Sequence, residues 1–207
     1  MVKILITDKL AKEGIDLLKS IEGVEPVVKT GISPEELISI IGDYDGLIVR
    51  SETKVTAKVL EKPGKLRAIA RAGAGVDNID VPAATKKGIL VMNTPGGNTI
   101  SAAEHTMALM LAMCRHIAPA SAKLKAGEWD KKSFMGVQLN NKVLGIIGLG
   151  RIGMAVAKMS TGFNMKILGY DPIATPPDAE KLGIEITDNI ERIFREADFI
   201  TVHVPKN

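Results

Sequence analysis

The sequence predicts an α/β protein built from two parallel β-sheets. Short apolar runs alternate with helix-like patterns through residues 1–95, and a second alternation begins at residue 142. Strands separated by helices form parallel sheets that are covered on both faces. Three glycines in G-x-G-x-x-G order, Gly148, Gly150 and Gly153, stand inside the second alternation. These observations predict two α/β domains in one chain of 207 residues.

The first domain, residues 1–95, is predicted to hold a parallel sheet of flavodoxin-like type. Its expected strands are residues 3–7, 24–28, 46–50, 66–70 and 90–92. A helix is expected over residues 9–20 and another after Asp80. A third should begin at Ser33, where Ser-Pro-Glu-Glu combines a capping box with proline at the first helical position.

Turn-forming residues 93–98, Asn-Thr-Pro-Gly-Gly-Asn, predict the domain boundary, and linking helices are expected over residues 96–141. Ser101 and Glu104 have the spacing of a second capping box, so a helix is expected from Ser101 to about Ile117. Because this helix is apolar on all sides, it should be buried between domains or between subunits. A homodimer formed through residues 101–117 is therefore expected.

The glycine motif predicts a dinucleotide site in residues 142–207. A buried strand, residues 143–147, precedes the motif, and an apolar helical stripe follows it. The first glycine permits a tight turn, the second lets a pyrophosphate approach, and the third lets helix and strand pack. Asp171 follows a second strand, 18 residues after Gly153. A carboxylate there binds the adenosine ribose and repels a 2′-phosphate, which favours NAD. The alternative is a tight turn followed by a solvent-facing aspartate.

Only half of a dinucleotide-binding domain fits into residues 142–207, because a complete one needs two mononucleotide-binding halves. The sequence therefore predicts an incomplete Rossmann (doubly wound) domain. The strand at residues 143–147 is expected to lack a partner on its far side, which would leave a bare apolar edge.

Two arginines end neighbouring strands of the first domain and indicate an anion site. Arg50 and Arg71 each follow an apolar run, and ligands of open parallel sheets bind beyond the carboxyl ends of strands. The glycine-rich turn at residues 73–75 offers N–H groups to a carboxylate. Either arginine could instead form a surface ion pair with Asp77 or Glu52.

Composition excludes several function classes. With a net charge of +3 and 3% aromatic residues, nucleic-acid binding is not expected. The longest apolar run, residues 107–114, is too short to span a membrane. One cysteine and an N-terminus without a secretory pattern indicate the cytoplasm. No His/Cys cluster has metal-ligand spacing, so no metal is expected.

Several segments together resemble the NAD-dependent D-2-hydroxyacid dehydrogenase family, in particular its branch acting on 3-phosphoglycerate. The segments are IVRS with TKVT at 48–56, RAGAGVDNID at 71–80, MNTPGGNTISAAEHT at 92–106, GLGRIG at 148–153 and YDP at 170–172. The resemblance covers essentially the whole chain. It implies NAD-dependent oxidation of 3-phosphoglycerate to 3-phosphohydroxypyruvate, in serine biosynthesis.

The resemblance also implies roles for individual residues. Those expected to contact the anionic substrate are Arg50, Ser51 and Gly73. Those expected at the cofactor are Ala74, Gly148, Gly150, Arg151, Ile152, Gly153, Asp171 and Val204. Ala74 stands where the family usually has threonine. The family's catalytic arginine, glutamate and histidine are expected downstream of the last strand of this chain, so no catalytic residue is assigned within it.

Other functions remain open from the sequence. One is reduction of another 2-oxo acid, such as hydroxypyruvate or glyoxylate. A second is a non-enzymatic NAD-binding or interaction fragment, because hydride transfer needs an acid/base pair and none is evident. Comparing activity on phosphorylated and unphosphorylated substrates would distinguish such a reductase from an enzyme that oxidises 3-phosphoglycerate.

Overall fold

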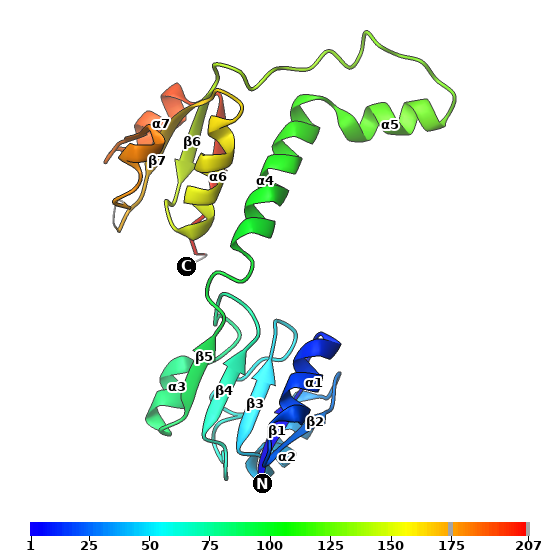
Figure 1. Ribbon diagram of the computed structural model, residues 1–207, viewed down its shortest axis with the longest axis vertical. Helices are drawn as coiled ribbons and strands as arrows, with labels where there is room; N and C mark the ends of the chain where they lie inside the picture. Colours follow the sequence, from blue (N-terminus) through cyan, green and yellow to red (C-terminus); the bar gives the residue numbers. More distant parts are fainter. Residues whose placement is uncertain (174–175, 206–207) are drawn as a thin grey trace. The chain divides into compact units, whose positions relative to one another are not determined.

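The computed structural model describes residues 1–173 and 176–205. The chain divides into two compact units, Met1–Asn98 and Thr99–Asn207. Each unit contains one sheet with only parallel strand pairs (Figure 1). The predicted α/β class with two parallel sheets is therefore confirmed.

The first unit is a five-stranded sheet of order β2-β1-β3-β4-β5, the flavodoxin-like order. Its strands are β1 (Val2–Ile6), β2 (Val24–Val28), β3 (Gly46–Val49), β4 (Ala68–Arg71) and β5 (Leu90–Asn93). Its helices are α1 (Lys12–Ser20), α2 (Pro34–Ile40), α3 (Val81–Lys86) and the single 3₁₀ turn η1 (Ile41–Asp43). The predicted cap of α2 is confirmed, because the Glu36 N–H donates to Ser33 Oγ at 3.1 Å.

The core of the first unit forms where strand side chains meet α2 and α3. Leu5, Leu47 and Ile69 lie on adjacent strands and pack with Leu37 of α2 and Ala84 of α3, all at most 2% exposed. Alternate residues of a strand point to opposite faces, so this cluster defines the covered face of the sheet. The strand ends at its carboxyl edge are thereby fixed, and the loops that follow them start from rigid positions.

The second unit is a four-stranded sheet of order β8-β7-β6-β9. Its strands are β6 (Val143–Ile147), β7 (Lys166–Tyr170), β8 (Ile184–Ile186) and β9 (Phe199–Val202). Its helices are α4 (Thr99–Cys114), α5 (Ile117–Lys125), α6 (Arg151–Thr161), α7 (Ile190–Glu196) and the 3₁₀ turn η2 (Glu180–Leu182). The expectation that β6 would lack a partner was wrong. β9 crosses to the far side of β6 and pairs with it from Leu144↔Phe199 to Ile147↔Val202. Among the described strands, β9 therefore forms the edge of this sheet next to β6.

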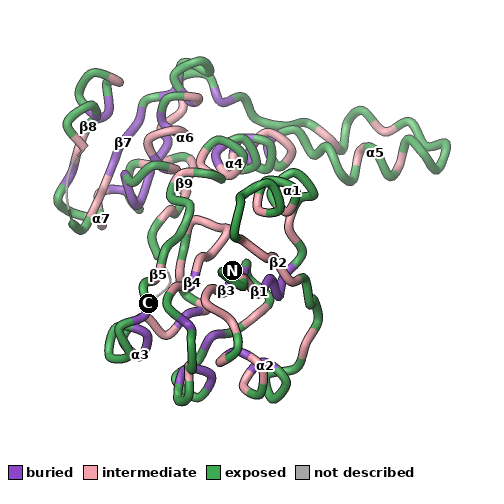
Figure 2. Tube along the Cα trace, turned by 60° about the horizontal axis from the view of Figure 1, so that its bottom comes forward, coloured by how far each residue is buried: buried purple, intermediate pink, exposed green. Residues whose placement is uncertain are grey.

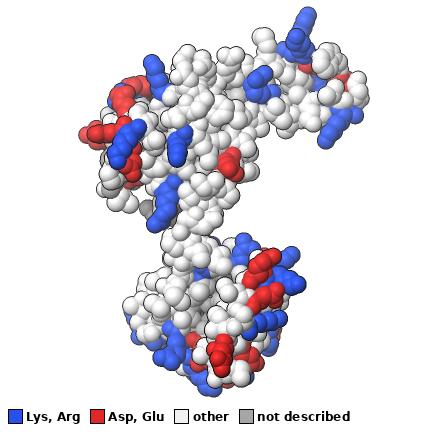
Figure 3. All heavy atoms as spheres, viewed as in Figure 1, with Lys and Arg blue, Asp and Glu red and all other residues white. Residues whose placement is uncertain are grey.

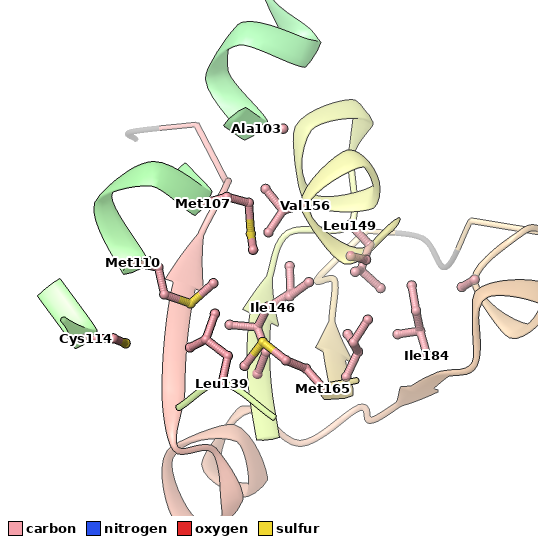
Figure 4. Packing of buried hydrophobic residues seen from close by; sticks show 14 residues of the cluster. Ala103, Met107, Met110, Cys114, Leu139, Ile146, Leu149, Val156, Met165 and Ile184 are labelled. Carbon is pink, nitrogen blue, oxygen red and sulfur yellow. The ribbon is translucent and has the colours of Figure 1, made fainter. Parts of the chain in front are cut away.

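Helix α4 supplies part of the second unit's core. Its Met107 and Met110 point toward Ile146 of β6 and Val156 of α6 (Figure 4). Ser160 Oγ of α6 donates to the carbonyl of Val156 at 2.8 Å, which satisfies this buried hydroxyl inside its own helix. One stripe of α4 is thus buried within the unit.

The expected capping of α4 by Ser101 was wrong. The helix begins two residues earlier, at Thr99, so Ser101 lies within its first turn. It also ends at Cys114 rather than continuing to Ile117. His116 adopts a left-handed conformation (φ 52°), which breaks the helical path and starts α5 in a new direction.

Lysine and arginine are interspersed with aspartate and glutamate on the visible face of the first unit (Figure 3). Helix α5 contains no buried residue and is exposed or half-buried along its length (Figure 2). Within the described ranges, no helix is long and apolar enough to cross a membrane. Those ranges also hold no group of three His, Cys, Asp or Glu residues placed to share a metal ion.

Candidate functional site

A pocket of 510 Å³ lies in the first unit, where β3 and β4 end. Its lining residues lie at or after the carboxyl ends of strands, where ligands of an open parallel sheet bind. The lining residues are Arg50, Ser51, Arg71, Ala72, Gly73, Ala74, Gly75, Asp77, Thr94, Gly97 and Asn98. The structure therefore brings together the three residues expected to bind substrate, Arg50, Ser51 and Gly73.

Arg50 is the exposed cation of this pocket. Its Nη1 donates to the carbonyl of Lys9 at 3.3 Å, and none of the ion pairs among the described residues involves it. A guanidinium presents five N–H donors in a planar fork that suits carboxylates and phosphates. Most of that donor capacity remains available to a ligand.

Arg71 is used differently, and the ion-pair alternative is the correct one for it. Its side chain is 12% exposed, and its Nη1 lies 2.7 Å from Asp77 Oδ1. Its Nε donates to the Arg50 carbonyl at 3.0 Å. A Cβ at Gly75 would lie 2.8 Å from the Arg71 Nη1, so glycine there makes room for this pair. Arg71 therefore stabilises the loops on either side of the pocket.

Gly73 has a different reason to lack a side chain. Its φ lies outside the left-handed region, and a Cβ would find its first neighbour, Arg71 Nε, at an ordinary 3.6 Å. Nothing inside the protein therefore requires glycine at this position. Gly73 lines the pocket, so a side chain at this position would take up space beside the ligand.

The motif glycines of the second unit also separate into two kinds. Gly148 has φ 95°, which other residues rarely adopt, and a Cβ on Gly153 would lie 2.0 Å from the Gly148 carbonyl oxygen. These two are required by the fold. Gly150, the N-cap of α6, has φ −67° and no atom within 4 Å of a built Cβ. Its missing side chain leaves space outside the protein, at a helix N-terminus that favours phosphate.

Asp171 directly follows β7 and binds the glycine turn. Its Oδ2 accepts the Leu149 N–H at 2.8 Å, and its Oδ1 accepts the Ile173 N–H at 2.9 Å. The sequence predicted Asp171 as a ribose acceptor but not this second role. A carboxylate has acceptor capacity for both roles.

The remaining expected cofactor residues lie in both units. Arg151 and Ile152 form the first turn of α6. Val204 is beside the glycine turn, since a Cβ on Gly148 would lie 2.8 Å from Val204 Cγ1. Ala74 belongs to the first unit, and its carbonyl accepts from Asn93 Nδ2 at 2.6 Å.

His203 is half-buried beside the same turn. Removal from water lowers its pKa, so the ring is neutral at pH 7. Its Nε2 lies 2.9 Å from the hydroxyl of Thr201. A hydroxyl in this position does not stabilise an imidazolium as a carboxylate would, which gives no support to a role in proton transfer.

Two residues that sequence reasoning missed hold the loop next to the pocket. Asp8 and Asn78 bind the backbone of residues 50–53 through their side chains. Asp8 could have been found, because it directly follows the first predicted strand, as Arg50 follows the third. No sequence signal indicated Asn78.

A second, more apolar hollow of 640 Å³ lies along α5 in the second unit. Trp129, at its rim, is 81% exposed. Asp130 forms a 2.7 Å ion pair with Lys123, and the hydrogen bonds from Lys123 and Ser133 lower the pKa of this carboxyl to about 2. Lys123 also lies 5.7 Å above the ring of Phe134. The polar contacts of Lys123 and Asp130 thus hold the segment after α5, and the apolar side chains that line the hollow remain exposed to solvent.

Comparisons with known proteins agree with this geometry. The chain is 54% identical over 205 residues to a D-3-phosphoglycerate dehydrogenase of Methanocaldococcus jannaschii, covering 99% of the chain and 39% of that protein. It is 50% identical over 203 residues to the Rattus norvegicus D-3-phosphoglycerate dehydrogenase, covering 98% and 38%. The chain thus spans less than two-fifths of the length of these relatives and matches their N-terminal part.

Solved structures show the same fold. The TT0316 protein of Thermus thermophilus superposes with a TM-score of 0.89 at 32% identity, over 100% of this chain and 66% of that one. A D-lactate dehydrogenase of Aquifex aeolicus, solved with NAD and lactic acid, gives 0.86 at 26% identity, over 99% and 61%. The sequence profile of the D-isomer specific 2-hydroxyacid dehydrogenase catalytic domain matches residues 4–202. With the strand orders and the glycine turn, this match establishes that the chain belongs to the D-isomer specific 2-hydroxyacid dehydrogenase family.

Proposed function

We propose that this chain binds the substrate and the adenosine half of NAD for the oxidation of 3-phosphoglycerate to 3-phosphohydroxypyruvate, in serine biosynthesis. Residues 1–95 would carry the substrate site, residues 142–207 the cofactor site, and residues 96–141 the linking helices. The observation that carries the proposal is the pocket in which the Arg50 fork and Gly73 meet at the carboxyl edge of a parallel sheet. Its working compartment would be the cytoplasm, which suits the single, unpaired Cys114.

The substrate site suits a small anion with more than one negative group. Arg50 offers its donor fork, and Ser51 offers a hydroxyl and a backbone N–H on the same loop. Gly73, on the opposite strand end, leaves room for a group to approach the backbone. A phosphate and a carboxylate on one short substrate would use both sides of the pocket.

The residues of the second unit fit the adenosine and pyrophosphate of NAD. The open face of Gly150 and the N-terminus of α6 suit the pyrophosphate, and Asp171 suits the ribose hydroxyls. NAD, when bound, would take the hydride from the substrate's carbinol carbon. Oxidation also needs a base for the hydroxyl proton and a cation near the developing carbonyl. Neither is assigned in this chain, and we expect binding with little or no turnover.

Three measurements on the purified 207-residue chain test this function. NADH binding, followed by nicotinamide fluorescence, and 3-phosphoglycerate binding, followed by calorimetry, should both be detected. Oxidation of NADH with 3-phosphohydroxypyruvate should stay at the level of the buffer control. Arg50→Gln should weaken 3-phosphoglycerate binding by about 10-fold or more and leave NADH binding unchanged.

Other results select the other functions. Turnover that persists through repurification would show that the chain does contain a catalytic group, with His203→Ala as the next variant. Tighter binding of glyoxylate or hydroxypyruvate than of the phosphorylated substrate would favour a reductase of another 2-oxo acid. NADH binding without any binding of these acids would indicate a cofactor-binding fragment without an enzymatic role.

We further propose that the chain forms a homodimer through the region of residues 101–117. Leu109 and Met113 lie one turn apart on α4 and are 59% and 63% exposed. A pair of large apolar side chains on one face suits a contact between subunits. The double variant Leu109→Lys/Met113→Lys should shift the wild-type dimer to monomer in light-scattering chromatography.

The matched control for the dimer is Leu17→Lys, an equally exposed residue of α1 (65%), which should leave the dimer intact. The proposal fails if the wild-type chain is monomeric at high concentration, or if the double lysine variant remains a dimer.

A further inference from the structure

Asp8 lies just beyond the last hydrogen-bonded residues of the β1–β3 strand pair. The two strands pair with Ile6 opposite Ile48, and the Thr7 N–H still donates to the Ile48 carbonyl at 3.1 Å. Two residues further along each strand, Asp8 lies opposite Arg50. The Asp8 carboxylate, only 2% exposed, turns toward the loop there and accepts hydrogen bonds that the strand would otherwise have supplied.

The carboxylate accepts hydrogen bonds from three of the four amides of residues 50–53. Asp8 Oδ2 accepts the Arg50 N–H at 2.6 Å and the Glu52 N–H at 3.2 Å. Oδ1 accepts the Thr53 N–H at 3.1 Å and also the Thr53 hydroxyl. Among the described residues, the Ser51 N–H has no such partner. The contacts to Asp8 therefore leave one amide of the loop unused, and it belongs to a residue that lines the pocket.

The carbonyls of the same loop are bound from the other direction. Asn78 Nδ2 donates to the Arg50 carbonyl at 2.8 Å and to the Thr53 carbonyl at 2.6 Å. The carbonyl of Asn78 itself accepts the Val55 N–H at 2.8 Å, which fixes Asn78 to the same stretch of chain. The loop is thus bound at its amides by one side chain and at its carbonyls by another.

We propose that Asp8 and Asn78 are positioning residues of the anion pocket, which hold residues 50–53 so that the Arg50 fork and the Ser51 N–H are presented to a ligand. Neither residue lines the pocket, so each acts through the loop. Without these contacts the loop would have to be ordered when the ligand binds, and that conformational cost would be subtracted from the affinity. This inference rests on the proposed function, because it presupposes that the pocket takes an anion.

The test compares variants of the full 207-residue chain by calorimetric titration with 3-phosphoglycerate. Asp8→Ala removes every acceptor and should raise the dissociation constant by at least about 10-fold. Asp8→Asn keeps the shape and one carbonyl oxygen, so it should restore part of the affinity. Asn78→Ala should weaken binding in the same direction as Asp8→Ala. NADH binding, which does not involve this loop, should be the same in all of them.

A buried aspartate also stabilises the fold, so a stability control is needed. Leu37→Ala removes a fully buried side chain of α2 and lowers stability without touching the loop. If Asp8→Ala does not fold, Thr53→Val removes the hydroxyl contact to Asp8 alone and should still weaken 3-phosphoglycerate binding. Such a loss in the Asp8 or Thr53 variants, absent from a Leu37→Ala chain of similar melting temperature, supports the proposal.

Three results would overturn it. One is unchanged 3-phosphoglycerate affinity in Asp8→Ala, or in Thr53→Val if that is the variant that folds. Another is an equal loss of affinity in Leu37→Ala, which would assign the effect to stability. A wild-type chain that binds NADH but not 3-phosphoglycerate would remove the anion site itself, and that result separates failure of the proposed function from failure of the positioning role.

Discussion

Replacing Gly153 by alanine is expected to destabilise the second unit by about 3 kcal/mol, the upper part of the range for overpacking a tight site. The new Cβ would lie 2.0 Å from the carbonyl oxygen of Gly148 and 3.3 Å from a methyl of Ile146. The nearest of these is backbone in a turn with φ 95°, which cannot give way as a flexible side chain could. Urea unfolding followed by circular dichroism measures the loss.

Gly150→Ala is the matched variant in the same motif. Its Cβ meets no protein atom within 4 Å, and its φ of −67° suits alanine, so stability should be unchanged or slightly higher. NADH affinity should nevertheless fall by about 10-fold or more, because the methyl would stand where the pyrophosphate approaches. Equal destabilisation by both variants, or full NADH binding by Gly150→Ala, would contradict the view that the fold requires Gly153 and the cofactor requires Gly150.

The sequence predicted most of the fold because its signals were local. Apolar runs followed by turn residues located most of the strands, and the capping box at Ser33 located the start of α2. The short strand β8 was not predicted. The start of α4 was misplaced because a capping-box spacing at Ser101 also occurs inside a helix that begins at Thr99. The end of α4 depends on the left-handed backbone of His116, which the apolar helical pattern running on to Ile117 did not indicate.

Pairings between distant segments were harder to predict than the segments themselves. The position of β9 beside β6 was not predicted, because strand order is decided by packing across the sheet. The same holds for the pocket. Arg50 and Arg71 looked equivalent by position, but only the three-dimensional contacts show that Arg71 is paired with Asp77 while Arg50 is exposed.

Asp171 has two roles, a ligand contact that the sequence predicted and a structural contact that it did not. As the last residue before the turn after β7, it accepts the Leu149 N–H from inside the glycine motif. The proposed ribose contact and the glycine turn are therefore linked through one carboxylate. A substitution at Asp171 should affect cofactor choice more than it affects the fold, provided that the new side chain still accepts from Leu149.

Asp171→Asn meets that condition, because its amide oxygen can still accept the Leu149 N–H. Its NADH affinity should fall by about 10- to 100-fold, since a charged acceptor for the ribose hydroxyls is lost. NADPH should lose less, or gain, because the carboxylate no longer repels the 2′-phosphate. Fluorescence titrations with both cofactors measure the ratio of the two dissociation constants. Asp178→Asn, which removes an exposed carboxylate paired with Lys181 in the same unit, should leave that ratio unchanged. If Asp171→Asn leaves it unchanged as well, Asp171 serves only to hold the glycine turn, and the preference for NAD must come from other residues.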